Sequence, residues 1–172
     1  MRSLVRRMAE GFRYALAMRT AQNLAAQRKF ENAKLPLTRF FSSFGAPGPS
    51  TNVPVEANIM FAGLCQWTDH QHAAYEACHV AIEQIKTDKC VVELSGEDKE
   101  YLLFHCKWKL SLITNFIDSV AFQDAVQTGV RYADLNLRRV SPRLRRRFPI
   151  TEDAGRALDQ YFEENEAELA RG

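Results

Sequence analysis

A proline- and glycine-rich run from Phe44 to Pro54 divides the chain into two regions that cannot share one continuous helix. Three prolines and two glycines fall within these eleven residues. Proline removes a backbone donor and glycine favours turns, so the run is predicted to be an extended connection. We therefore assign residues 1–40 to a basic segment, residues 41–54 to a linker and residues 55–172 to a helical domain.

The charge of the chain is distributed unevenly across this linker. Residues 1–40 contain seven arginines and two lysines but only two acidic residues, whereas the rest contains 14 basic and 19 acidic residues. Such an asymmetry indicates an extension with a role of its own. The 172 residues are enough for one domain with an extension, and no window is apolar enough to predict a spanning helix.

The basic segment is typical of a mitochondrial targeting sequence. Apolar residues recur at helical spacing, and Arg2, Arg6 and Arg13 lie largely off that stripe. The stripe consists of Leu4, Val5, Met8, Phe12, Ala15 and Leu16. The motif from Arg39 to Ser43 resembles a matrix-peptidase site cut after Phe40. The alternatives are a retained amphipathic arm packed on the domain and a basic arm for nucleic acid.

The domain is predicted to be mainly α-helical. A first helix is expected over Val55–Gln66, and Thr68 with Gln71 fits a capping box that starts a second. The apolar stripe of the second helix is Ala74, Ala77, Cys78, Ala81, Ile82 and Ile85. Gln84 lies off this stripe and is expected to tolerate leucine. Two helices joined by a short turn predict a small orthogonal bundle of helical hairpins, similar in architecture to tetratricopeptide and pentatricopeptide proteins.

The later part of the domain shows two further helix starts. Ser95, followed by Glu97 and Asp98, is expected to cap a third helix that is apolar on two sides and extends toward Gly129. Residues 90–94 are expected to form a short β-run or a connector. Residues 138–149 are expected to be irregular, and Thr151 to cap a last helix.

The sequence offers no convincing catalytic or metal-binding motif, so an enzyme is disfavoured and no cofactor is expected. The four cysteines, Cys65, Cys78, Cys90 and Cys106, lack the spacing of a zinc ribbon and are expected to be structural thiols. His72, Glu76 and His79 share a helix face and could approach a metal, but a fourth ligand is not evident. A solvated or interface surface is the favoured interpretation.

The candidate site is a cluster of six arginines in ten residues. These are Arg138, Arg139, Arg143, Arg145, Arg146 and Arg147. Arginine binds carboxylates and phosphates bidentately, so a protein partner, cardiolipin head groups and RNA phosphates are all open. The alternative is internal neutralisation by the acidic C-terminal region, including Glu163, Glu164, Glu166 and Glu168. RNA is disfavoured because the region after the linker is acidic overall.

Residues 129–149 resemble the matrix-side helical subunit of the cytochrome bc1 complex. Gly129–Leu135 matches that family's Gly-apolar-basic-aromatic-x-Asp-Leu turn, and Arg146–Pro149 resembles its Arg-apolar-Pro helix start. The upstream helices have no counterpart in this resemblance, and the family's further C-terminal portion is absent here. The resemblance implies a place in a respiratory complex.

These observations together predict a non-catalytic accessory subunit of a mitochondrial inner-membrane energy-transducing complex, either ATP synthase or a respiratory-chain complex. It would be peripheral to the membrane, on the matrix side, with other subunits and cardiolipin as partners. The alternatives are a mitoribosomal or RNA-associated helical protein, and a small matrix enzyme or assembly factor.

Overall fold

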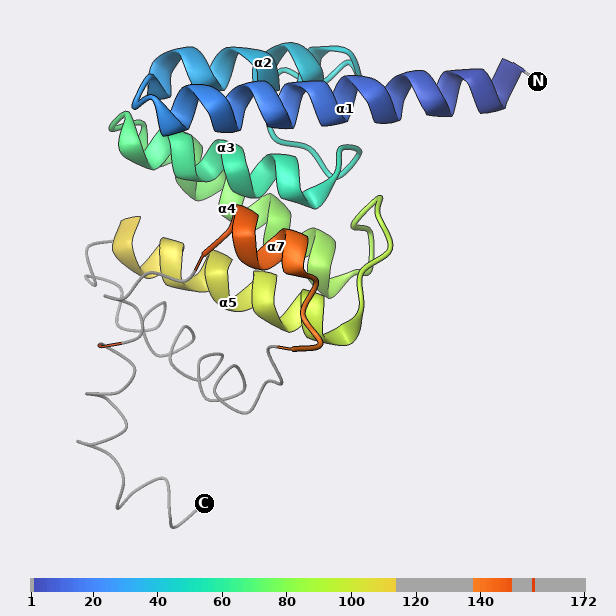
Figure 1. Cartoon of the computed structure of the whole chain (residues 1–172). Coiled ribbons are helices and arrows are strands. Elements are labelled where there is room, and N and C mark those ends of the chain that lie inside the picture. The colour runs from blue at the N-terminus through green and yellow to red at the C-terminus, as the bar shows by residue number, and fades with distance from the viewer. Residues whose placement is uncertain (1, 114–137, 150–155, 157–172) are drawn as a thin grey trace. The chain divides into compact units, whose positions relative to one another are not determined.

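The computed structural model describes residues 2–113, 138–149 and 156, and every regular element in these ranges is an α-helix. This confirms the predicted mainly α-helical class. The helices in the described ranges, labelled in Figure 1, are α1 (Arg2–Ala26), α2 (Phe30–Ser42), α3 (Val55–Trp67), α4 (Gln71–Lys86), α5 (Gly96–Ile113) and α7 (Pro142–Arg147). None of them is long and apolar enough to cross a membrane.

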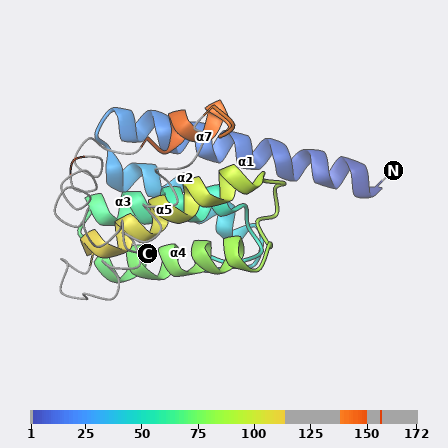
Figure 2. The same cartoon turned by 90° about the horizontal axis from the view of Figure 1, so that it is seen from below.

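The chain forms two compact units, residues 1–93 and residues 94–172. The basic segment, the linker and the first two helices of the expected domain therefore belong to one unit. In unit 1, α1 packs on α2, α2 on α3 and α3 on α4. Figures 1 and 2 both show α1 running past the end of α2 toward the N-terminus.

Unit 1 is built from two helical hairpins with matching turns. Residues 27–29 join α1 to α2, and residues 68–70 join α3 to α4. The middle residues, Arg28 and Asp69, have positive φ angles of 58° and 59°. The amide of Lys29 donates to Leu24 O at 2.9 Å, and that of His70 donates to Cys65 O at 2.8 Å. Both helices thus end in a Schellman motif, which usually places glycine at the left-handed position.

One buried cluster of unit 1 draws most of its residues from the segment expected to be a targeting sequence or an arm. The buried cluster consists of Ala17, Met18, Ala21, Ala33, Leu37, Phe40, Phe41, Val53, Ala57 and Leu64. Phe41 is fully buried and packs edge-on against Phe61 of α3, with ring centroids 5.3 Å apart. Cleavage after Phe40 would remove six of these ten core residues.

A buried amide pair holds the linker against the second hairpin. The Asn58 Nδ2 amine donates to Gln84 Oε1 at 2.8 Å and to Ser50 O at 2.9 Å. Gln84 Nε2 donates to Val53 O at 2.7 Å, and both amide side chains are fully buried. The expectation that Gln84 tolerates leucine is wrong, because its side chain satisfies buried backbone groups of the linker.

The two hairpin helices α3 and α4 follow the predicted pattern with one correction. All six stripe residues of α4 are buried. The capping box is wrong, because Thr68 ends α3, and its hydroxyl donates back to Leu64 O at 2.9 Å. The N-cap of α4 is His70, without a side-chain capping bond. A hydroxyl can serve either helix end, and here it bonds the preceding turn.

In unit 2, Ser95 caps α5 as predicted, since its hydroxyl accepts the Asp98 amide at 3.0 Å. Buried residues lie on both predicted faces of α5, including Leu102, Cys106 and Trp108. Residues 90–94 form a connector rather than a strand. The expected extension of α5 beyond Ile113 and the helix after Thr151 lie outside the described residues.

Candidate interaction surfaces

Four of the six clustered arginines lie on a short helix, and buried apolar side chains lie within it and at both of its ends. The predicted irregular segment in fact contains α7, which begins at Pro142. Proline suits the first turn of a helix because its missing donor would be unpaired there anyway. Val140 and Leu144 are fully buried, and Phe148 is 5% exposed. Leu144 is the buried residue of α7, whereas Arg143, Arg145 and Arg146 on the same helix are exposed.

Two hydrogen-bonded contacts fix α7 to α5 within unit 2. The buried carboxylate of Asp98 accepts the Ser141 amide and the Ser141 hydroxyl, each at 2.8 Å. At the other end of α7, the Tyr101 hydroxyl donates to Phe148 O at 2.6 Å. The arginines of α7 therefore lie on a helix held in place by hydrogen bonds to α5, although the sequence predicted an irregular segment.

The six arginines differ in how exposed they are to solvent. Arg138, Arg139, Arg143, Arg145 and Arg146 are exposed, while Arg147 is half-buried. Arg139 lies 3.5 Å from the Glu97 carboxylate in a mostly solvent-exposed pair, and such pairs contribute little to stability. We call the exposed arginines of α7 (Arg143, Arg145 and Arg146) the arginine surface. The acidic residues at 163–168 lie outside the described residues.

The predicted apolar stripe of α1 is exposed along the first four turns of the helix. Leu4, Val5, Met8, Phe12 and Leu16 are between 55% and 70% exposed. Further along the same helix, Met18 and Ala21 are fully buried in the core of unit 1. The helix thus has a free apolar half and a packed half.

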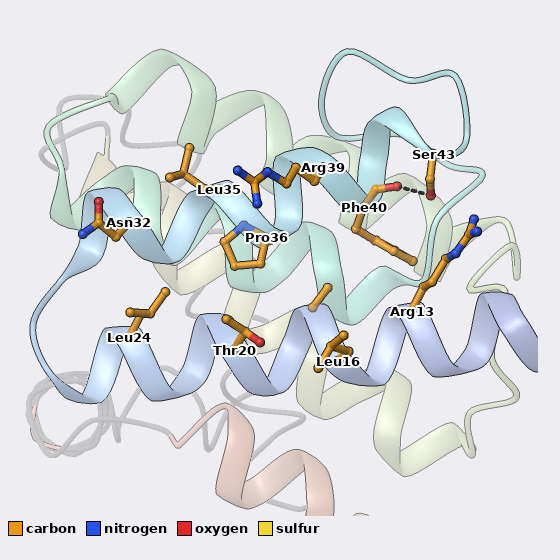
Figure 3. Close-up of a pocket in the computed structure, with 11 residues that line it drawn as sticks. Arg13, Leu16, Thr20, Leu24, Asn32, Leu35, Pro36, Arg39, Phe40 and Ser43 are labelled. Atoms are coloured by element: carbon orange, nitrogen blue, oxygen red, sulfur yellow. Dashed lines mark hydrogen bonds between the residues drawn. The ribbon is translucent and has the colours of Figure 1, made fainter.

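A groove with a volume of about 580 Å³ runs between α1 and α2. Figure 3 shows Leu24 and Asn32 near the turn that joins the helices, and Arg13 and Ser43 at the opposite end. The lining residues are Arg13, Leu16, Ala17, Thr20, Leu24, Asn32, Leu35, Pro36, Arg39, Phe40 and Ser43. The groove is mainly apolar, and its only charged lining residues are arginines.

A polar cluster that the sequence did not reveal joins the two hairpins at Lys34. The Lys34 ammonium lies 2.8 Å from the Glu31 carboxylate, and it donates to Thr68 Oγ1 at 3.0 Å and approaches His70 Nδ1 at 3.2 Å. The hydrogen bond that Glu31 accepts from Lys34 lowers the pKa of the exposed Glu31 carboxyl. The Lys34 ammonium is thus saturated, and the cluster serves as a polar clamp between α2 and the α3–α4 turn.

The candidate metal-binding face does not converge in the structure. His72 lies 3.2 Å from Glu76, but the His79 ring packs against Tyr75 with centroids 4.3 Å apart. Among the described residues, no three histidine, cysteine or acidic side chains gather as metal ligands. The arrangement is that of a solvated helix face.

The four cysteines are free thiols and all are buried. This agrees with their expected structural role. Burial raises the pKa of the Cys65 thiol to about 11. A thiol with so high a pKa is a poor nucleophile at neutral pH.

A half-buried titratable group lies against Phe148 at the end of α7. The His105 ring packs on Phe148 with centroids 5.5 Å apart. Desolvation, followed by the charge of Lys109, holds the pKa of His105 well below its usual value of 6.5. The ring is neutral at physiological pH and acts as a packing group.

Comparisons with protein-family models, curated proteins and solved structures gave no match for this chain. The similarity of residues 129–149 to the bc1 subunit therefore gains no support from relatives. Residues 129–137 lie outside the described residues, and so does any helix that would begin after Pro149.

Proposed function

We propose that this protein is a non-catalytic accessory subunit of a mitochondrial inner-membrane energy-transducing complex, either ATP synthase or a respiratory-chain complex. It would be bound peripherally on the matrix side. The observation that carries the proposal is a helix of targeting composition whose second half, together with α2, supplies seven of the ten residues of a buried cluster in unit 1. In this proposal the basic segment directs import and is then retained as part of the fold.

Retention follows from the position of the expected cleavage bond. The bond between Phe40 and Phe41 lies in the last turn of α2, and both side chains are buried. A protease needs an extended, accessible chain, so the folded unit protects this bond unless it opens locally. Processing there before folding would remove six of the ten residues of this buried cluster.

The arginine surface supports docking to an acidic partner. Arg143, Arg145 and Arg146 are exposed on α7, while Leu144 of the same helix is buried. Arginine is favoured at protein interfaces because its planar fork pairs with carboxylates in a fixed geometry. We also propose that the two hairpins of unit 1 pack as in tetratricopeptide-like proteins. Their succession in the chain supports this, since such hairpins bury their apolar faces by stacking.

The decisive experiment compares two variants of the tagged full-length chain in mitochondria. Arg143, Arg145 and Arg146 are changed together to glutamine, and the control changes the exposed Lys29, Lys86 and Lys89 to glutamine. Both should keep a helical circular-dichroism spectrum, because exposed charges contribute little to folding. On native gels, only the arginine variant should leave the complex.

Three other results would count against this account. Unfolding of the arginine variant would show that the cluster neutralises acidic groups within the chain. Equal retention of both variants would show that the arginine surface is solvated. Migration of the unmodified chain with the mitoribosome would favour the RNA-associated alternative.

A further inference from the structure

The first four turns of α1 show a charge distribution that the core of unit 1 does not require. Leu4, Val5, Met8, Phe12 and Leu16 are all more than half exposed. At 3.6 residues per turn, these five positions fall within a sector of about 120° around the helix axis. Between residues 4 and 16 this sector contains no charged residue.

Arginines border the apolar sector on both sides. Around the helix axis, Arg7 lies beyond one edge of the sector, and Arg6 and Arg13 lie beyond the other edge. All three are exposed. The only acidic residue of α1, Glu10, lies on the far side of the helix from the sector, where it pairs with Arg6 at 2.9 Å. The helix thus presents an apolar face between two cationic edges.

This arrangement is complementary to an anionic bilayer surface. A helix of this kind lies in the plane of the interface, with its apolar face about 5–10 Å into the boundary between head groups and acyl chains. Long cationic side chains at the edges can then reach the phosphates while their stems stay in the apolar layer. Each cation near an anionic leaflet adds electrostatic attraction.

A protein partner fits the same observations less well. The exposed face runs along a single helix that extends beyond α2, as Figures 1 and 2 show. A protein surface would be expected to cover α1 together with its neighbour, whereas a lipid interface can surround the free side of one helix.

We propose that residues 4–16 of α1 form an in-plane membrane anchor for anionic lipid, with the apolar stripe inserted and Arg7 and Arg13 at the phosphates. The proposal rests on the proposed function for the identity of the membrane and deepens it by naming how the subunit is held there. The second half of α1, packed in the core of unit 1, would transmit this attachment to the folded body.

The test is flotation of the purified full-length chain with phosphatidylcholine vesicles, with or without cardiolipin or phosphatidylserine. The unmodified chain should float with either anionic mixture and not with phosphatidylcholine alone, and salt should weaken binding. Changing Met8 and Phe12 together to glutamine should lower the partition coefficient about tenfold or more. Glutamine preserves the helix, since it is a good helix former.

A matched control removes two exposed apolar side chains outside the stripe. Leu35 and Val91 are 52% and 61% exposed, and changing both to glutamine should leave binding unchanged. Replacing Arg7 or Arg13 by glutamine should each weaken binding to anionic vesicles, roughly fivefold per arginine. Binding to cardiolipin but not to phosphatidylserine would identify a head-group preference within the same mechanism.

Several outcomes would overturn the membrane anchor. These are failure of the unmodified chain to float, equal loss in the control variant, or undiminished flotation of the Met8/Phe12 variant. If the chain does not float but the Met8/Phe12 variant leaves its native complex, the stripe is a protein interface. A chain that floats but joins no mitochondrial complex would refute the proposed function and leave the anchor standing.

Discussion

The two hairpins of unit 1 share a turn and differ in what they bury. Each joins its helices through three residues with a left-handed middle residue. The α1–α2 hairpin packs large side chains, among them Met18, Leu37 and Phe41, and leaves half of α1 exposed. The α3–α4 hairpin instead buries a face of small residues on α4. The same connection therefore serves two different kinds of packing.

The difference indicates which substitutions each hairpin will tolerate. A core of large side chains is sensitive to truncation, because a cavity remains where the side chain was. A face of alanines and a cysteine lets helices approach closely and is sensitive to enlargement. The free half of α1 should be insensitive to both, since its side chains are exposed.

The largest expected effect is in the first hairpin. Phe41→Ala should lower the free energy of unfolding by about 3–5 kcal/mol, since a fully buried aromatic ring is lost. Phe12→Ala is the control, because Phe12 is 70% exposed. Urea denaturation of both variants measures the difference. A similar, small change in both would mean that α1 and α2 are an appendage rather than part of the core.

The second prediction concerns the amide that joins the linker to the second hairpin. Gln84→Leu should cost about 2–4 kcal/mol, because Asn58 and the Val53 carbonyl each lose a buried hydrogen-bond partner. Glu83→Leu, one residue earlier on an exposed position, should cost little. Thermal unfolding distinguishes them, and equal midpoints would contradict the buried amide pair.

The third prediction tests the small-residue face of α4. Ala77→Leu or Ala81→Leu should overpack a fully buried position and cost about 1–3 kcal/mol. Ala73→Leu, at a half-buried position of the same helix, should cost less. Urea denaturation midpoints of the three variants measure the difference. If Ala73→Leu proved the most damaging, the assignment of the buried face of α4 would be wrong.

Periodicity predicted α3, α4 and the buried stripe of α4 well, because amphipathic spacing reports local geometry. It did not predict α2, and the stripe that it gave for α1 is exposed. Ala74, Ala77, Cys78 and Ala81 are buried as their spacing indicates. Periodicity failed for Gln84, whose burial depends on the linker carbonyls of Thr51 and Val53, more than 30 residues away in sequence. It also failed for Thr68, because a hydroxyl between two helices can bond to either one.

The candidate arginine surface was only partly predictable from the sequence. Composition identified the six arginines, but two prolines in the segment favoured an irregular structure. Asp98, more than 40 residues earlier, caps the segment through Ser141 and helps α7 to form. Such a long-range contact leaves no local signal. The polar clamp at Lys34 escaped prediction for the same reason, since Thr68 and His70 come from a different hairpin.

The smallest expected effect concerns the left-handed residues of the two matching turns. Arg28 and Asp69 both occupy a left-handed conformation that strains most side chains. Aspartate adopts it more readily than arginine, because its short side chain can hydrogen-bond locally, and Asp69 Oδ1 accepts a bond from Gln71 Nε2 at 3.4 Å.

Arg28→Gly should therefore stabilise the fold by roughly 0.5–1 kcal/mol, since the relief of strain outweighs the added freedom of the unfolded chain. Asp69→Gly should give a smaller gain, because relief of a milder strain is offset by the lost side-chain bond. Differential scanning calorimetry of the two variants measures the contrast. A larger gain at Asp69 than at Arg28 would show that the two turns, despite equal φ angles, are strained for different reasons.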